Sequence, residues 1–337
     1  MNIAINGFGR IGRIVFKAIL DKKIKVNLVA INDLSDLKTL AHLLKYDSVY
    51  GKYDKRVSHT KDSLVVDGKK FQVLSEKDPK KLPWKNMKVD LVLECTGLFR
   101  TKEELSGHLK AGAKKVVISA PAKSEEIKTV VLGVNEEEIH KDDKIISMAS
   151  CTTNCLAPVS ATLKDSVGIE KAIMSTVHSY TSTQNIIDGP HKDLRRARTA
   201  AVNIIPTSTG AAKATTKAIP SLVDKFDGMA LRVPTPVGSL CDIVFITKKN
   251  TTSEEVNNVL EKASRKKKLK GILTTTKDPI VLSDIVGDPS SCIVDLSLTK
   301  VVDGNLLKVI AWYDNEWGYG NRLADIVQYF LKKKLIS

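Results

Sequence analysis

The chain has 337 residues, of which 42% are hydrophobic and 27% charged, and its formal net charge is +15. This length is enough for two domains with sizeable cores, and no apolar run approaches the ~20 residues that a membrane helix needs. Because the N-terminus starts with a strand-like run and not with a basic-then-apolar leader, we expect a cytoplasmic protein whose five cysteines are mostly reduced.

The positive charge raises the question of nucleic-acid binding. Most of the excess is lysine spread over surface-like positions, and the denser clusters at 265–270 and 332–334 contain no aromatic residues. This pattern favours a lysine-rich solvated surface that also attracts anionic substrates and cofactors. A basic surface that binds nucleic acid or another surface stays open as the alternative.

Up to about residue 150, short apolar runs alternate with helix-like segments, which predicts a doubly wound, mostly parallel sheet. A charged insertion at 50–75, with the turn signal Asp-Gly at 67–68, predicts a hairpin added to that sheet. The predicted strands are 2–6, 26–32, 89–97, 114–121, 129–134 and 144–150, and the predicted helices are 10–22, 36–45 and 102–111.

After residue 167 the strands become longer and alternate between apolar and polar residues, which predicts an α+β region with a mostly antiparallel sheet and helices on one face. An amphipathic helix is predicted at the end of the chain, over 317–334. The other predicted strands are 170–181, 227–236, 240–248, 290–302 and 305–315, and the other predicted helices are 151–166, 210–219 and 253–268.

The first strand is followed by glycines in G-x-G-x-x-G spacing, at Gly7, Gly9 and Gly12. Placed between a strand and a helix, such glycines permit a tight turn, close approach of a pyrophosphate and close helix–strand packing. Asp33 ends the second strand, where a carboxylate binds the ribose hydroxyls of NAD and repels the 2′-phosphate of NADP. The sequence therefore predicts a Rossmann-type NAD site; the alternative is ordinary turn glycines and a helix-capping Asp33.

Two later strand ends, at Thr96 and Ser119, fall where such a sheet presents its ligand crevice, although they could equally be ordinary strand-to-loop connections. Neither adds independent support for the site.

Cys151 stands where a predicted strand gives way to a helix, and a thiolate at a helix start is stabilised by the dipole and the free N–H groups. Cys155, one turn later, is expected to be buried and inert. A zinc site is not expected, because there is no second Cys/His pair at ligand spacing, and we predict no bound metal.

A thiol nucleophile needs a base, and His178 ends an apolar strand beside hydroxyl residues. A lone histidine there could also be structural. The other histidines, His42, His59, His108, His140 and His191, lie in polar or helical segments without special context.

Groups that suit anions also occur in this half. Arg195, Arg196 and Arg198 stand close together, and Thr209 and Gly210 precede a predicted helix. Arg232 lies alone in an apolar strand, and a part-buried arginine usually has an anionic partner. A salt-bridge cluster at the surface or at a subunit interface is the alternative for these arginines.

Together these residues resemble the family of phosphorylating glyceraldehyde-3-phosphate dehydrogenases. The resemblance runs from Asn2 to about Leu331, and its cysteine motif is far more specific than its glycine motif. The matching motifs are "NGFGRIGR", "ASCTTNCLAP", "STVHSYT", "HKDLRRAR", "TSTGAAKA", "RVPTPVGS" and "WYDNEWGY".

The resemblance implies that Cys151 is the nucleophile and His178 its base, in an NAD-dependent oxidation of glyceraldehyde 3-phosphate that ends with attack by inorganic phosphate. It implies one phosphate site for the substrate, at Thr181 and Arg232. The second site, for inorganic phosphate, comprises Ser150, Thr152, Arg196, Thr209 and Gly210.

The resemblance also implies cofactor contacts, with Asn315 on the nicotinamide carboxamide and Lys77 where many members have arginine. It implies an NAD-binding domain of 1–150 joined by 316–337, a catalytic domain of 151–315, and a homotetramer. The remaining cofactor residues are Gly7, Gly9, Arg10, Ile11, Gly12, Asp33, Thr96 and Ser119. A close rival is erythrose-4-phosphate dehydrogenase, which shares the cysteine and histidine but releases its thioester to water.

Overall fold

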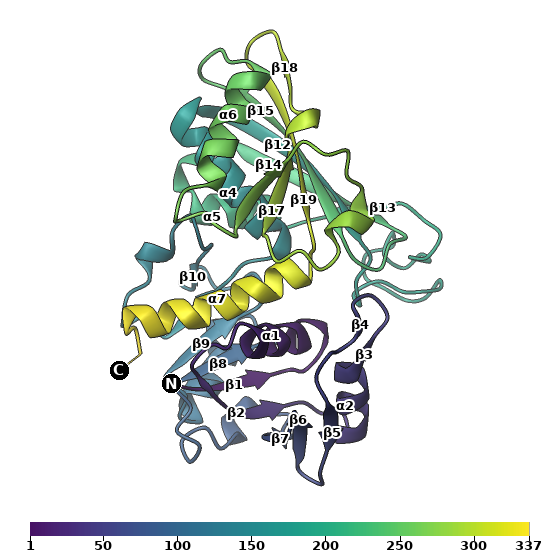
Figure 1. Cartoon of the computed structure of the whole chain (residues 1–337), viewed down its shortest axis with the longest axis vertical. Helices are drawn as coiled ribbons and strands as arrows, with labels where there is room; N and C mark the ends of the chain where they lie inside the picture. Colours follow the sequence, from purple (N-terminus) through teal and green to yellow (C-terminus); the bar gives the residue numbers. More distant parts are fainter. Residues whose placement is uncertain (337) are drawn as a thin grey trace. The chain divides into compact units, whose positions relative to one another are not determined.

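The computed structural model describes residues 1–336, and the chain folds into two compact units. The first comprises Met1–Val130, Glu137–Ala149 and the chain from Gly320 onward; the second comprises Val131–Glu136 and Ser150–Tyr319. Each unit has its own large sheet (Figure 1). Within residues 1–336, no helix is both long and apolar enough to cross a membrane.

The first unit contains a mostly parallel sheet, with nine strands among the described residues, in the order β10-β11-β9-β8-β1-β2-β7-β6-β5. Its central strands are buried along almost their whole length, as expected when helices cover both faces of a sheet. The strands are β1 (Asn2–Asn6), β2 (Asn27–Asn32), β5 (Val57–His59), β6 (Ser63–Val66), β7 (Lys69–Leu74), β8 (Leu91–Glu94), β9 (Lys115–Ile118), β10 (Lys128–Thr129) and β11 (Ile145–Ser147).

The helices of this unit follow the predicted pattern. A capping box between Thr101 and Glu104 starts α3, and Gly320 lies so close to α1 that a Cβ there would fall 2.4 Å from Ile14. The helices are α1 (Arg10–Asp21), α2 (Leu37–Lys45), α3 (Lys102–Lys110) and, from Gly320 onward, α7 (Trp317–Lys333). The small ribbon beside α2 is β3 (Tyr46–Asp47) with β4 (Gly51–Lys52).

The predicted hairpin is confirmed: β6 pairs antiparallel with β7 across Asp67 and Gly68, which both have positive φ. The predicted strand 129–134 is wrong, since only β10 forms. Gly133 has a φ of 85°, and the amides of Val134 and Asn135 donate to the carbonyl of Val131, so this segment folds into a turn.

The second unit contains a mostly antiparallel sheet, in the order β13-β14-β12-β15-β19-β17-β16, with β18 pairing with β19. In β15 buried residues alternate with part-buried ones, so one face of that strand packs into the core. The strands are β12 (Ile169–Ser179), β13 (Ile205–Ser208), β14 (Phe226–Val233), β15 (Ser239–Thr247), β16 (Leu273–Thr276), β17 (Cys292–Asp295), β18 (Lys300–Val302) and β19 (Leu306–Tyr313).

The core of the second unit lies between this sheet and three helices that pack together on it (Figure 1). They are α4 (Cys151–Ser166), α5 (Ala211–Ala218) and α6 (Ser253–Ser264). The predicted single strand 290–302 is wrong, because Asp295 accepts hydrogen bonds from the N–H and hydroxyl of Ser297 and so starts a 3-10 turn, η5 (Leu296–Leu298), between β17 and β18. The fold class predicted from the sequence, a Rossmann-type sheet plus an α+β unit, is confirmed.

Candidate active site and dinucleotide pocket

The glycine turn after β1 has the geometry that a phosphate cradle requires. Gly7 has a φ of 89°, and a Cβ there would lie 2.7 Å from the amide nitrogen of Thr96. A Cβ at Gly12 would fall 2.1 Å from the carbonyl oxygen of Gly7, so only glycine allows α1 to pack this closely. Gly9 instead faces open space and is the N-cap of α1 without a side-chain cap, which leaves room for an anion at the helix start.

A pocket of about 450 Å³ lies beside this turn, at the carboxyl ends of β1, β2 and β8. Asp33 lies in its wall, and its carboxylate accepts hydrogen bonds from the amides of Phe8 (2.7 Å) and Ser35 (2.9 Å). The lining residues are Asn6, Gly7, Gly9, Asn32, Asp33, Leu34, Glu76, Lys77, Cys95, Thr96, Leu98 and Phe99. The glycine cradle, the carboxylate and the apolar walls fit a dinucleotide.

The structure brings Gly7, Gly9, Asp33, Lys77 and Thr96 together around this pocket. Other predicted cofactor residues lie outside its lining. Arg10 pairs with Asp47 at 2.7 Å, Ile11 and Gly12 follow in α1, and the Ser119 amide donates to the Glu94 carbonyl.

Sequence reasoning missed the apolar walls at Leu34, Leu98 and Phe99. Leu34 and Leu98 are 60% and 72% exposed, and the available signal in the sequence was the occurrence of leucines in the loops that follow β2 and β8.

In the second unit, Cys151 is the first residue of α4, and the Ser150 hydroxyl caps the helix by accepting from the Thr153 amide at 3.1 Å. The Cys151 Sγ lies 3.5 Å from Nε2 of His178, which is the reach that a nucleophile and its base need. Cys155, one turn later, is completely buried.

His178 is the penultimate residue of β12 and is only 4% exposed. The parallel pairing of β12 with β14 places it directly opposite Arg232. Its Nδ1 lies 2.7 Å from the Ser179 carbonyl and 2.6 Å from Nη1 of Arg232, which itself donates to that carbonyl at 2.9 Å.

A guanidinium can only donate, so these two close contacts of Nδ1 cannot both be hydrogen bonds at one time. The tautomer whose Nδ1–H donates to Ser179 leaves Nε2 as an acceptor facing the Cys151 thiol. His178 in that form is arranged to take the thiol proton.

The electrostatics of the pair depend on burial. Burial, and secondly Arg232, lower the pKa of His178 to about 3, so its imidazole is neutral at pH 7. Burial raises the pKa of Cys151 to about 11, while Arg232 and the hydroxyl and N–H of Thr152 act in the opposite direction. The N–H at the helix start thus favours the thiolate, as the sequence-based argument expects, but the desolvation of the buried thiol acts more strongly in the opposite direction.

Sequence reasoning missed Tyr313, a fully buried residue at the end of β19. Its hydroxyl lies 2.9 Å from that of Thr152 and 2.8 Å from that of Thr176, and its ring lies edge-on to His178 with centroids 6.0 Å apart. It therefore fixes the Thr152 hydroxyl beside the thiol. The signal was a buried tyrosine, whose hydroxyl requires partners.

Asn315 lies just beyond β19, and its Oδ1 accepts from the Ser179 hydroxyl (3.0 Å), the Gly238 amide (2.9 Å) and the Ser239 hydroxyl (3.1 Å). These donors fix the orientation of the amide, which leaves Nδ2 as its hydrogen-bond donor.

The predicted phosphate residues are only partly gathered. Ser150, Thr152 and Arg232 surround the Cys151–His178 pair, and the Thr153 hydroxyl donates to the Ala211 carbonyl at 3.4 Å, which joins the start of α4 to the start of α5. The N-cap of α5 is Gly210, preceded by Thr209.

The remaining predicted phosphate residues have other partners. Arg196 donates from Nε to the Thr207 hydroxyl at 2.8 Å and pairs with Asp193, whereas the Thr181 hydroxyl contacts that of Thr183. Among residues 1–336, no group of three or more His, Cys, Asp or Glu side chains is arranged to hold a metal ion.

Both halves of the chain resemble known proteins. Residues 1–102 match the family model for the glyceraldehyde 3-phosphate dehydrogenase NAD binding domain, and residues 150–315 match the model for its C-terminal domain. Curated relatives named glyceraldehyde-3-phosphate dehydrogenase include those of Thermotoga maritima (54% identical, covering 98% of this chain and 99% of the relative) and Streptomyces coelicolor (52%, covering 98% of each). The chain belongs to the glyceraldehyde-3-phosphate dehydrogenase family.

Proposed function

We propose that this chain catalyses the NAD-dependent oxidative phosphorylation of D-glyceraldehyde 3-phosphate to 1,3-bisphosphoglycerate, as a step of glycolysis. The observation that carries the proposal is the 3.5 Å contact between Sγ of Cys151 and Nε2 of His178 at the start of α4, with Arg232 beside the imidazole. A thiol, a neutral base and a cation in one place suit an aldehyde that carries a phosphate.

Cys151 Sγ attacks the aldehyde carbon, and its proton passes through His178 to the former carbonyl oxygen, giving a thiohemiacetal. The Cys151 N–H stabilises the oxyanion as it forms. His178 would then accept the hydroxyl proton as the carbon is oxidised to a thioester, a step for which NAD, held by the residues named below, would supply the hydride acceptor. Inorganic phosphate attacks the thioester carbon and breaks its bond to the Cys151 sulfur, which leaves as a thiolate and takes up the proton held by His178, so that the thiol and the neutral base are restored.

Two anion sites are part of this proposal. Thr181 and Arg232 bind the phosphate of the substrate. Inorganic phosphate is bound at the neighbouring starts of α4 and α5, where helix N–H groups favour anions, and this placement is supported by the hydrogen bond between Thr153 and Ala211. The residues of this second site are Ser150, Thr152, Arg196, Thr209 and Gly210.

The cofactor residues are proposed on the same basis. In the NAD-binding domain, comprising 1–150 and 316–337, the glycine turn holds the pyrophosphate and Asp33 holds the adenosine ribose. In the catalytic domain, 151–315, Asn315 binds the nicotinamide carboxamide, which is supported by the three donors that fix its Oδ1. The other cofactor residues are Arg10, Ile11, Lys77, Thr96 and Ser119.

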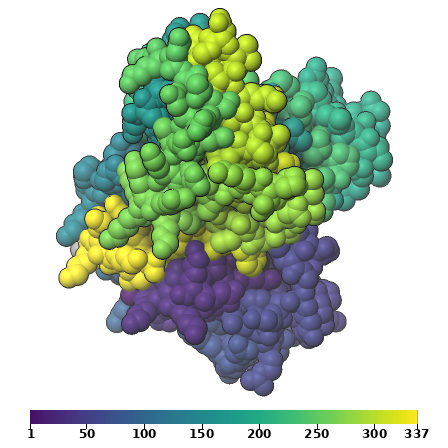
Figure 2. Space-filling model, turned by 45° about the horizontal axis from the view of Figure 1, so that its top comes forward, coloured from purple at the N-terminus to yellow at the C-terminus, as the bar shows by residue number. Residues whose placement is uncertain are grey.

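We further propose a cytoplasmic homotetramer. Support comes from the segment between β12 and β13, which projects from its unit (Figure 2) and exposes five large apolar side chains by 68% to 81%. Exposed apolar surface of this kind marks protein–protein contact. The residues are Ile186, Ile187, Leu194, Val202 and Ile204.

The test is the absorbance of NADH formed by the full chain with each combination of NAD or NADP, with or without phosphate, and with glyceraldehyde 3-phosphate or erythrose 4-phosphate. We expect NADH only with NAD, and a rate with glyceraldehyde 3-phosphate that depends on phosphate. A rate independent of phosphate, or faster with erythrose 4-phosphate, would assign the chain to the rival enzyme. Cys151→Ser is the inactive control.

A further inference from the structure

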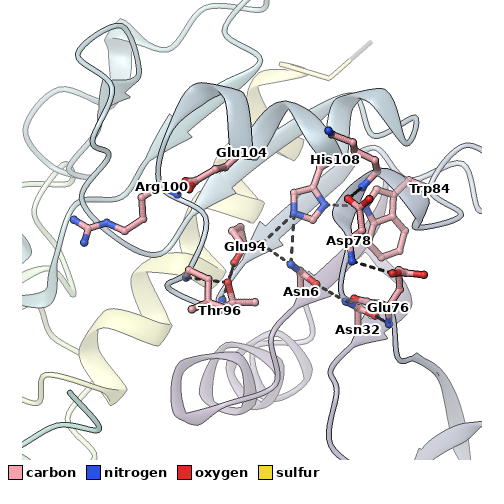
Figure 3. Close-up of polar contacts among 12 residues, drawn as sticks. Asn6, Asn32, Glu76, Asp78, Trp84, Glu94, Thr96, Arg100, Glu104 and His108 are labelled. Carbon is pink, nitrogen blue, oxygen red and sulfur yellow. Dashed lines mark hydrogen bonds and ion pairs between the residues drawn. The ribbon is translucent and has the colours of Figure 1, made fainter. Parts of the chain in front are cut away.

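A buried polar cluster, whose contacts Figure 3 shows, shares four residues with the lining of the dinucleotide pocket. Its centre is the carboxyl group of Glu94, at the end of β8, together with the imidazole of His108, in α3. Glu94 is 1% exposed and His108 is fully buried. Titratable groups with so little contact with water are costly unless all their hydrogen bonds are made, so their partners indicate what they do.

Every partner of the Glu94 carboxyl is a donor. Oε2 accepts from Nδ2 of Asn6 at 2.5 Å and from Nε2 of His108 at 3.0 Å. Oε1 accepts from the Thr96 amide at 2.8 Å and from the Thr96 hydroxyl, which in turn accepts from the Leu98 amide. No partner is left to receive a proton from Glu94, so the network is complete only when this group is a carboxylate.

The proton of His108 is fixed as well. Nε1 of Trp84 lies 3.0 Å from Nδ1 of His108, and an indole N–H can only donate. Nδ1 is therefore the acceptor, and Nε2 carries the proton that is donated to Glu94. The imidazole is held in one tautomer, because a proton on Nδ1 would face the indole N–H.

The network extends from Glu94 into the pocket wall, as the dashed lines of Figure 3 show. Oδ1 of Asn6 accepts from Nδ2 of Asn32 at 2.7 Å. Asn32 makes two hydrogen bonds to the backbone of Glu76: its Oδ1 accepts from the amide and its Nδ2 donates to the carbonyl, each at 2.9 Å. Asn6, Asn32, Glu76 and Thr96 all line the pocket, so one buried carboxylate fixes four positions in its wall.

We propose that Glu94 and His108 are positioning residues for the dinucleotide: they touch no ligand themselves, but hold the wall that binds it. This inference rests on the proposed NAD contacts of the pocket. It gives His108 a role through its hydrogen bonds to Trp84 and Glu94, and it predicts that affinity for NAD depends on a donor at the position of His108 Nε2.

The experiment compares three variants of the full chain by calorimetric titration with NAD, thermal unfolding and steady-state kinetics. His108→Ala removes both hydrogen bonds. His108→Gln keeps an acceptor for Trp84 and a donor for Glu94. Leu105→Ala is the matched control, since Leu105 is fully buried one turn earlier in α3 and belongs to the apolar core rather than to the network.

We expect His108→Ala to raise the Kd and the KM for NAD by about tenfold, which is about 1.4 kcal/mol of binding free energy. The kcat at saturating NAD and iodoacetate labelling of Cys151 should change less than about twofold. His108→Gln should recover most of the affinity, and Leu105→Ala should lower the melting temperature without changing the Kd.

A wild-type Kd in His108→Ala, an equal rise in Leu105→Ala, or no recovery in His108→Gln would overturn the inference. Should His108→Ala fail to fold, Glu94→Gln carries the same test, because it keeps the size of the side chain but turns one acceptor into a donor that faces other donors; a wild-type Kd there would also overturn it. A wild-type chain that binds no NAD would refute the proposed function itself, which separates the two failures.

Discussion

The substitution His178→Asn tests the proposed base most directly, because it removes the Nε2 side of the imidazole ring and keeps a nitrogen close to the place of Nδ1. The Nδ2 of asparagine occupies nearly the place of the imidazole Nδ1, so the hydrogen bond to the Ser179 carbonyl, 2.7 Å long in the wild type, can be kept. What is lost is Nε2, the atom that lies 3.5 Å from Sγ of Cys151. The substitution thus removes the proton acceptor with the adjoining part of the ring, while the contact to the Ser179 carbonyl can be kept.

The size of the loss follows from the two pKa values. A thiol whose pKa burial raises to about 11 is ionised in only about one molecule in 10⁴ at pH 7. His178, neutral because its pKa is lowered to about 3, removes this limit by accepting the proton during attack. Without it the rate should fall by about 10²- to 10⁴-fold, equivalent to about 2.7 to 5.4 kcal/mol in the barrier.

The assay is the initial rate of NADH formation between pH 7 and 9, with Cys155→Ser as a control for loss of a neighbouring thiol in the same helix. In His178→Asn the rate should climb with pH, because hydroxide must now generate the thiolate, whereas the wild-type rate should be much flatter. A variant that keeps more than about a third of the wild-type rate at pH 7, or one whose rate is independent of pH, would refute the role of His178 as base.

Three further predictions concern single groups. Iodoacetate should label Cys151 stoichiometrically and be blocked by substrate, while the completely buried Cys155 stays unmodified in peptide mass spectra; the reverse order would contradict the assignment. Asp33→Ala should narrow the preference for NAD over NADP, measured as the ratio of kcat/KM, by about tenfold or more, since the repelling carboxylate is gone; an unchanged ratio would count against it. Burial would raise the pKa of Asp47, but the amides of Val49 and Tyr50 and the Arg10 guanidinium together lower it below its ordinary value of 3.8. The ionised Asp47 therefore stabilises the folded state fully above pH 3.8, and this stabilisation is lost as the pH falls through the lower pKa of the folded state. In urea unfolding, the free energy of unfolding should therefore fall less between pH 6 and pH 3 for Asp47→Asn than for the wild type. An equal fall in both proteins would show that the Arg10–Asp47 ion pair does not contribute to acid destabilisation.

The features that the sequence predicts well are those whose causes are local. The glycine turn depends on residues 7 to 12, where backbone conformation and helix packing admit only glycine at Gly7 and Gly12. The 67–68 turn is likewise set by its own two residues. Strand 129–134 was a wrong prediction for a related reason: its apolar pattern suits a strand, but the conformation of Gly133 and the hydrogen bonds to Val131 fold it into a turn.

Tyr313 and Arg232 mark the limit of such reasoning. Their partners are Thr152, 161 residues away from Tyr313, and His178, 54 residues away from Arg232. Only the register of β14 and β19 within the sheet decides that these side chains meet at the start of α4. The charge of Arg232 and the hydroxyl of Tyr313 make each residue a candidate, but they do not identify its partner. The balance between desolvation and the helix dipole at Cys151 likewise depends on how deeply the thiol is buried, which only the folded structure shows.

His108 is a residue that the sequence provides no reason to select, although the fold gives it specific partners. In the sequence it sits among Lys, Glu and Ser in a helix whose composition is typical of a solvent-exposed one, and nothing separates it from the other histidines of polar segments. In the fold it is fully buried, with Trp84 24 residues and Glu94 14 residues away. A helix of polar composition can therefore direct one titratable side chain into the core, provided that the core supplies both a donor and an acceptor for it. The condition involves Trp84, Glu94 and His108 together, and it predicts that glutamine can replace His108 whereas alanine cannot.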